Sequence, residues 1–284
     1  NYEINQTDAS DNITLLAMMQ RWPTATWSSL AERALFQADK LHHLAAHDPE
    51  NLMLVRSRIE LAEFLQRRQS NPTLIGGLLG TEGSHALDGD LANIQRLYNR
   101  GFRMMSLQHF FDNKLGGSLH GTSGAGLTQF GRDAVAEMLA LGIMLDVSHS
   151  SEQVVADTLA LSDKPLIVSH TGFQGHCDSP RNISDALMEQ IAAAGGLIAV
   201  GFWDGAICGN SPATVAAAIV YGIGLVGEDH VALGSDFDGT VTTSFDGSEM
   251  AVITQALLDA NLSEQQIRKV MGENMLGYLQ TYLP

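Results

Sequence analysis

The stretch GIMLDVSHSSEQVVADTLALSDKPLIVSH, residues 142–170, contains two short apolar runs on either side of a helical segment. The two runs, GIMLDVSH and PLIVSH, each end in a Ser-His pair, at His149 and at His170. Residues 151–161 between them are predicted as a helix. A strand, a helix and a second strand in this order are typical of a parallel βαβ unit. The stretch therefore predicts a parallel sheet with histidines at its strand ends.

The same alternation continues in both directions from this unit. Further strands are predicted at residues 73–83, 103–109, 196–203 and 230–237. Helices are predicted at residues 88–99, 127–140, 183–194, 212–223, 247–260 and 263–281. Ser263 and Gln266 have the spacing of a capping box at the start of the last helix. Strands that are continuous apolar runs belong to parallel sheets buried on both faces, so the sequence predicts an α/β fold.

Residues 1–70 have a different pattern, which is mainly helical. Apolar residues return every three or four positions from about Ala31 to Gln69, and NITLLAMM near the start is also predicted as helix. Six strands are predicted, whereas a closed barrel needs about eight. We therefore expect one domain, residues 1–284, with a β/α core in residues 71–284. It would be a TIM-type (β/α)₈ barrel without its first two β/α units, or alternatively an open sheet.

Composition limits the classes of partner. With 284 residues, 45% of them hydrophobic, the chain can bury a large core. Its formal charge of −16, from 32 acidic and 16 basic residues, repels phosphate backbones and anionic membrane surfaces. No apolar run approaches the roughly 20 residues that span a bilayer. We expect neither a nucleic-acid partner nor a transmembrane segment.

Four predicted strand ends carry side chains that can bind a metal. They are Glu82 in LLGTEG, His149, His170, and Asp236 in LGSDFDG. In a parallel barrel the carboxyl ends of the strands gather at one face, so these side chains would meet. Carboxylate and imidazole together suit Zn²⁺ or a similar divalent ion. Glu82 is flanked by glycines, and its carboxylate could bridge two ions about 3.5–4 Å apart.

Other polar residues are candidates for catalysis and substrate binding. His109, at the end of strand 103–109, is the candidate for stabilising an oxyanion. Arg181, in SPRN, offers the planar, bidentate grip that fits a substrate carboxylate. Of Asp236 and Asp238, one could take a proton from the attacking water while the other caps the turn. Four residues near these segments receive no role: His85, His120, Asp146 and His176.

These residues, in this order, resemble the membrane dipeptidase (renal dipeptidase) family of zinc peptidases, peptidase family M19. The resemblance runs from about Leu74 to GENMLGYL at residues 272–279. Its motifs are TEGSHALDGD, LQH, LTQFGRDAVAEMLALGIMLDVSHSS, SHTGF, SPRNISD and GSDFDG. It implies a TIM-type barrel with two zinc ions bridged by Glu82, one of them also held by His149 and His170.

The resemblance also implies an activity. The family hydrolyses dipeptides, often with a D-residue on the carboxyl side, by a hydroxide that bridges the metal ions. By resemblance, His109 contacts the tetrahedral intermediate, Arg181 binds the substrate carboxylate and Asp236 handles the bridging water. Family members are often dimers, so a homodimer is an open expectation. Two alternatives remain: tautomerisation or lactam hydrolysis on the same metal barrel, and a non-catalytic scaffold.

Two cysteines, Cys177 and Cys208, are too few for a Cys₄ zinc site and leave either one disulfide or two inert thiols. They fall where secreted members of the resembled family pair two cysteines. The resemblance therefore implies a disulfide and an exported protein, periplasmic or extracellular. A cytoplasmic location is the alternative.

The chain departs from the family pattern in two places. An H-x-D pair on the family's first strand completes the first zinc site, and no such pair precedes Glu82; His47-Asp48 lacks the spacing. We therefore expect the native chain to begin further upstream and to supply the pair, and this chain to support only the His149/His170 site. After GFWDGAIC the family's pocket tyrosine is missing, which favours a differently bound substrate side chain. No H-x-H pair occurs, which disfavours a deaminase-type amidohydrolase.

Overall fold

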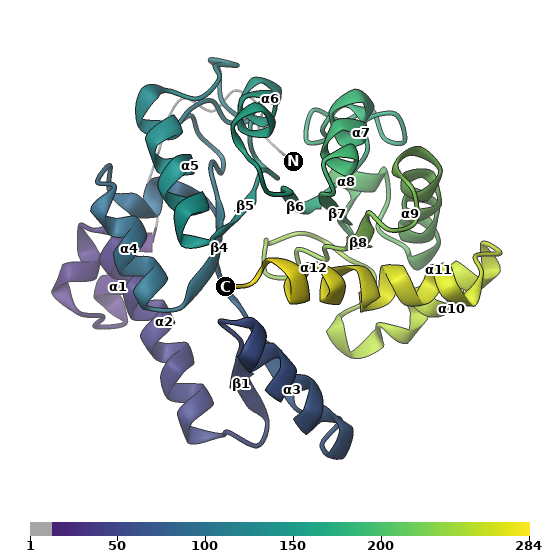
Figure 1. Cartoon of the computed structure of the whole chain (residues 1–284), viewed down its shortest axis with the longest axis horizontal. Coiled ribbons are helices and arrows are strands. Elements are labelled where there is room, and N and C mark those ends of the chain that lie inside the picture. Colours follow the sequence, from purple (N-terminus) through teal and green to yellow (C-terminus); the bar gives the residue numbers. More distant parts are fainter. Residues whose placement is uncertain (1–12) are drawn as a thin grey trace.

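A computed structural model describes residues 13–284, and the first twelve residues of the predicted helical region lie outside the described part (Figure 1). Six parallel strands form one sheet in chain order, β3-β4-β5-β6-β7-β8. Their bounds are β3 Leu79–Thr81, β4 Phe102–Ser106, β5 Met144–Asp146, β6 Ile167–Thr171, β7 Leu197–Val200 and β8 Val231–Leu233. The predicted α/β fold with a parallel sheet is confirmed. Within residues 13–284 no strand pairing joins β3 to β8.

Helices alternate with these strands. They are α1 Ile13–Met19, α2 Leu30–His47, α3 Arg58–Ser70, α4 Ala92–Asn99, α5 Gln129–Leu141, α6 Glu152–Leu161, α7 Asp185–Ala193, α8 Asp204–Ile207, α9 Pro212–Val226, α10 Ala251–Asp259, α11 Glu264–Arg268 and α12 Asn274–Tyr282. Several begin at a hydroxyl side chain that accepts a backbone N–H of the first turn, namely Ser29, Ser57, Thr128, Ser151, Ser211 and Ser263. Such caps satisfy donors that have no partner inside the helix. The predicted capping box of Ser263 and Gln266 is present.

The middle of the six-stranded sheet is buried on both faces, as the apolar runs predict: β5 and β7 are buried throughout, whereas β3 at the sheet edge is partly exposed. Along β5, Met144 and Leu145 belong to two different apolar clusters. The outer cluster, which contains Leu145, packs the sheet against the helices that surround it. The inner cluster, which contains Met144, also contains Leu61 of α3 and Tyr278 of α12. Figure 1 shows α12 running toward the C-terminus near the centre of the view. Helices α3 and α12 therefore fill the inner side of the sheet.

Two sequence predictions about strands need correction. The predicted strand at residues 73–83 is two strands, β2 Ile75–Gly77 and β3, which pair with different partners. The partner of β2 is β1, Leu52–Leu54, which lies within the stretch predicted as helical from residue 31 to 69. Helix α2 ends at His47 because Pro49 disfavours helical geometry at the residue before it. The apolar run NLMLV is thereby free to pair as a strand.

The two cysteines form the disulfide that the family resemblance implies. Cys177 and Cys208 are bonded, with their Cα atoms 5.5 Å apart, so the loop after β6 is tied to the end of α8. Among residues 13–284, the stretch Asp204–Val226 is long and apolar enough to cross a membrane, by length and composition alone. It consists of α8 and α9, separated by Cys208 in a left-handed conformation, and α9 contributes Val215 and Ile219 to the core. Packing in the core thus accounts for part of its apolar composition.

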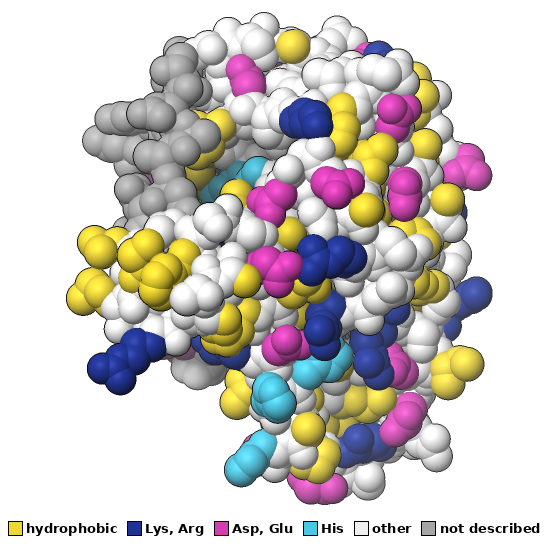
Figure 2. Space-filling model, turned by 90° about the vertical axis from the view of Figure 1, so that its left-hand side faces the viewer, with side chains coloured by type: hydrophobic (Ala, Val, Ile, Leu, Met, Phe, Trp, Pro, Cys, Tyr) yellow, Lys and Arg dark blue, Asp and Glu magenta, His cyan; other side chains and the backbone are white. Residues whose placement is uncertain are grey.

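On the face drawn in Figure 2, basic and acidic side chains are interspersed.

Candidate metal centre

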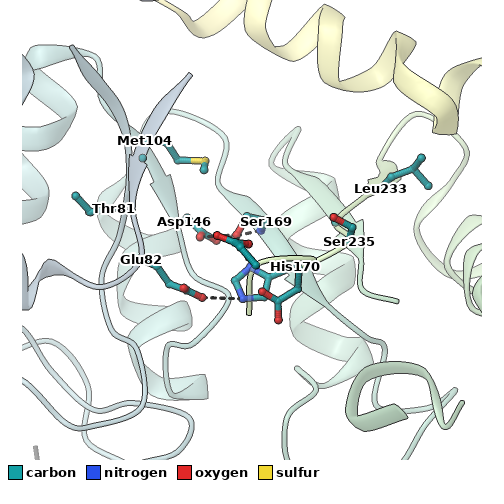
Figure 3. Close-up of a pocket in the computed structure, with 12 residues that line it drawn as sticks. Thr81, Glu82, Met104, Asp146, Ser169, His170, Leu233 and Ser235 are labelled. Carbon is teal, nitrogen blue, oxygen red and sulfur yellow. Dashed lines mark hydrogen bonds and ion pairs between the residues drawn. The ribbon is translucent and has the colours of Figure 1, made fainter. Parts of the chain in front are cut away.

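The carboxyl ends of the strands bring the predicted metal ligands together. Glu82 follows β3, His149 follows β5 and His170 lies within β6. The three side chains form the one group of potential ligands found among residues 13–284. Figure 3 shows Glu82 and His170 pointing toward each other across the edge of the sheet. Glu82 and His149 are 67 positions apart in sequence, and His149 and His170 are 21 positions apart, yet the three side chains meet at one place.

The three ligand atoms of this group form a nearly equilateral triangle. Nε2 of His149 is 2.9 Å from Nε2 of His170 and 3.0 Å from Oε1 of Glu82, and the third side measures 3.1 Å. For a tetrahedral ion with ligand bonds of about 2.0–2.1 Å, ligand atoms lie about 3.3 Å apart. The donor set, two imidazoles and a carboxylate, and its spacing therefore fit Zn²⁺ or a similar divalent ion.

The other ring nitrogen of each histidine has its own partner. Nδ1 of His149 lies 3.0 Å from Nε2 of His120, and Nδ1 of His170 lies 2.8 Å from Oγ of Ser169. Outer contacts of this kind orient the ring of a metal-binding histidine. They turn both Nε2 atoms toward Glu82.

Electrostatics at the cluster reflect its burial. Burial alone would raise the pKa of Glu82, but hydrogen bonds from His149 and His170 outweigh it and hold that pKa well below its usual range. Burial lowers the pKa of His149 well below its usual value, and the nearby charge of Arg181 acts in the same direction. At neutral pH the site thus presents a carboxylate and uncharged imidazole, the forms that bind metal.

The predicted oxyanion-stabilising residue also lies at the cluster. Nε2 of His109 is 3.5 Å from Oε1 of Glu82, and its ring meets the ring of His149 edge-on, with centroids 4.6 Å apart. Burial lowers the pKa of His109 to about 4. Its side chain stays a quarter exposed, so it can be reached from solvent.

Asp236 lines a cavity of about 360 Å³. The cavity opens between the ends of β3 and β8, and Glu82, His170 and Asp238 also line it. Asp236 has a left-handed backbone, with φ of +58°, which is unusual for a residue other than glycine. Burial raises the pKa of Asp236, and the charges of Glu82 and Asp238 add to the rise.

Arg181 lies beneath the histidines and is almost fully buried, with 1% of its surface exposed. Its Nη1 donates to the backbone oxygen of Ser148 at 2.7 Å and to Oγ1 of Thr171 at 2.9 Å. Its Nη2 donates to the backbone oxygen of His170 at 2.8 Å and lies 3.5 Å from Nε2 of His149. The guanidinium therefore ties together the two segments that carry the histidines.

Several site residues have no role in the sequence predictions. Asp146, Ser169 and His120 all contact a metal-ligand histidine directly or through one side chain. A sequence signal existed for part of this set, because both strand ends place a serine before the histidine. The H-x-D triplet at residues 176–178, by contrast, lies outside the cluster, and the ring of His176 packs 5.5 Å from that of Tyr221.

Comparisons with known proteins give the following similarities. The family profile described as membrane dipeptidase (peptidase family M19) matches residues 12–281. The dipeptidase verJ of Clonostachys rogersoniana is 30% identical over 252 residues, covering 86% of this chain and 64% of that protein. The chain thus spans less than two thirds of the length of this curated relative.

Solved structures agree with this family. The structure of dipeptidase AC, a metallo peptidase of family M19, is 27% identical with a TM-score of 0.78, covering 89% of this chain and 77% of that chain. A metallo peptidase from Rhodobacter sphaeroides, liganded with a phosphinate mimic of the dipeptide L-Ala-D-Ala, is 26% identical with a TM-score of 0.76. That alignment covers 87% of this chain and 74% of the other.

Proposed function

Because the chain belongs to peptidase family M19, the membrane dipeptidases, we propose that it is a metal-dependent hydrolase that cleaves the peptide bond of dipeptides. One observation supports this above all. Nε2 of His149, Nε2 of His170 and Oε1 of Glu82 lie within 3.1 Å of one another beside a cavity large enough for a small ligand. Such a set of donors beside a cavity is the usual setting of a catalytic metal.

We propose Zn²⁺ as the metal that these three residues hold. Imidazole and carboxylate are common zinc ligands, and three protein ligands leave a position for water or substrate. A bound divalent ion would polarise the scissile carbonyl and lower the pKa of a water molecule so that it attacks at neutral pH. The second oxygen of Glu82 could hold another ion, as the family resemblance implies.

Two residues beside the ligands would handle charge and protons. His109, with a pKa of about 4, is uncharged at neutral pH and keeps one ring N–H. That N–H could donate to the oxygen of the scissile carbonyl as negative charge develops there. Asp236, whose pKa is raised by burial, is a better base than an exposed aspartate and could accept a proton from the attacking water.

Arg181 would recognise the free carboxylate of the substrate. Its Nη2 lies beside the ligand cluster, at 3.5 Å from Nε2 of His149, so its positive charge is close to where a short substrate must bind. Nη1 already donates to Ser148 and Thr171, so Nη2, which faces His149, would make the charge-assisted contact with the carboxylate. Recognition of a free carboxylate so close to the metal ligands would restrict the enzyme to very short peptides. The relative that binds an L-Ala-D-Ala mimic supports the proposal that a D-residue is accepted on the carboxyl side.

The disulfide between Cys177 and Cys208 supports a further part of the proposal, namely that the protein works in an oxidising compartment outside the cytoplasm.

The test is hydrolysis of a panel of dipeptides by purified protein reconstituted with zinc. We expect cleavage of L-L and L-D dipeptides, and little cleavage of the same dipeptides with an amidated carboxyl terminus. Glu82→Gln should abolish both zinc binding and cleavage. Glu264→Gln, at a side chain that is 87% exposed, is the matched control and should leave both unchanged. Protein that retains zinc but cleaves none of the dipeptides would contradict the proposal.

A further inference from the structure

Asp146 is joined to the metal-ligand histidine His170 by a single hydroxyl. Its carboxylate, 3% exposed, lies at the end of β5 and lines the cavity (Figure 3). Oγ of Ser169 donates to Oδ2 of Asp146 at 2.6 Å, and the same Oγ lies 2.8 Å from Nδ1 of His170. The three side chains form a continuous hydrogen-bonded chain from a buried carboxylate to an imidazole ring.

The donors around Asp146 determine the direction of this chain. Oδ1 of Asp146 accepts the backbone N–H of Ser148 at 3.1 Å, the backbone N–H of Ser169 at 3.0 Å and the hydroxyl of Ser148 at 2.6 Å. A serine hydroxyl has a single hydrogen, and that of Ser169 is donated to Oδ2. Oγ of Ser169 can then only accept from His170. Nδ1 of His170 therefore carries a ring hydrogen, and Nε2, which faces Glu82 and His149, is the nitrogen left to bind a metal.

We propose that Asp146 is a positioning residue, which acts through Ser169 to hold His170 in the tautomer whose Nε2 binds the metal. The inference rests on the proposed metal centre, since it concerns how one of its ligands is oriented. Partners that orient metal-binding histidines typically change metal affinity by about 10–100-fold when they are removed. Asp146 touches no metal ligand itself, so its effect must pass through the serine.

Asp146→Asn keeps the shape of the side chain but reverses the direction of the hydrogen bonds that run through Ser169 to His170. The amide oxygen must take the place of Oδ1, because two backbone N–H groups point there. The amide nitrogen then faces Oγ of Ser169 and donates to it. The hydroxyl of Ser169 now donates to Nδ1 of His170, so the ring hydrogen moves to Nε2. In that tautomer the metal-binding nitrogen has no lone pair available.

The experiment measures zinc affinity by competition with a chromophoric chelator and histidine tautomers by ¹⁵N NMR of the metal-free protein. Asp146→Asn should bind zinc about 10–100-fold more weakly than the wild type and show the Nε2–H tautomer at His170. Asp157→Asn is the matched control, because this partly buried carboxylate also accepts a backbone N–H, from Leu127 at 2.9 Å, but bonds none of the residues that link Asp146 to His170. Its zinc affinity should stay within a few-fold of the wild type, with Nδ1–H retained. Ser169→Ala should weaken zinc binding as Asp146→Asn does, and it replaces that variant if the latter does not fold.

The outcomes separate this inference from the metal centre on which it rests. Equal zinc affinity in wild type, Asp146→Asn and Ser169→Ala would overturn the positioning role and leave the metal centre intact. An Nε2–H tautomer in the wild type would overturn it as well. Failure of the wild type to bind zinc would instead overturn the metal centre, and the role of Asp146 in metal binding with it.

Discussion

Replacing Arg181 by methionine should destabilise the fold as well as impair substrate binding. The guanidinium is buried and donates to the backbone oxygens of Ser148 and His170 and to the hydroxyl of Thr171, at 2.7–2.9 Å. Methionine fills similar space but donates nothing, so both carbonyl oxygens lose this donor inside the protein. A buried polar group without its partner costs about 1–3 kcal/mol. Two such groups give about 2–6 kcal/mol of lost stability.

The assay is chemical and thermal unfolding of the metal-free protein, so that metal binding does not enter. A loss of this size lowers the midpoint temperature by about 2 °C per kcal/mol in a chain of this length, hence by about 4–12 °C. Arg132→Met is the matched control: it removes an arginine that is 41% exposed and whose partner Asp157 lies 3.0 Å away. That change should cost at most about 1 kcal/mol. If Arg181→Met were as stable as Arg132→Met, the structural role of Arg181 would be refuted.

Three further predictions concern the scaffold. Tyr278→Phe removes the hydroxyl that donates to the backbone oxygen of Pro165 at 2.7 Å, and should lower the free energy of unfolding by about 1–2 kcal/mol in a denaturant titration. The double change Cys177→Ser and Cys208→Ser opens a loop of 31 residues and should cost about 3–4 kcal/mol, whereas a reductant should then have no further effect on stability. Burial would raise the pKa of Asp112, but hydrogen bonds from three backbone N–H groups outweigh it and lower that pKa. The ionised carboxylate therefore stabilises the fold above the unfolded pKa of about 3.9, and this stabilisation is lost as the pH falls below that value. Between pH 6 and pH 3 the wild type should therefore lose more stability than Asp112→Asn, and an equal loss would contradict this.

The part of the fold that could be predicted is the part encoded in short periodic patterns. Strands β5 and β7 in the middle of the main sheet are continuous apolar runs, and both of their faces are buried as expected. The strand β1 could not be predicted, because three residues between two helices give too short a pattern. The split of residues 73–83 depends on which neighbouring strand each half meets. That information is not local to the run.

The site was predictable where a ligand ends a strand. Glu82, His149 and His170 each follow or end an apolar run, and parallel strands bring such positions together. Asp146 lies within the same kind of run, and alternation along the strand does not show that it meets the serine before His170. The register between the neighbouring strands determines this contact, and the register is set by hydrogen bonds between the strands. The single domain of residues 1–284, the homodimer and the catalytic roles of His109 and Asp236 stay predictions.

The central claim is that Glu82, His149 and His170 form a metal centre. The most direct measurement is the zinc content and zinc affinity of the purified chain, compared with His149→Asn and His170→Asn. The account predicts at least one zinc per wild-type chain, and loss of that zinc in both variants because each removes one of three ligand atoms. A wild-type chain without zinc, or zinc retained unchanged in both variants, would contradict it.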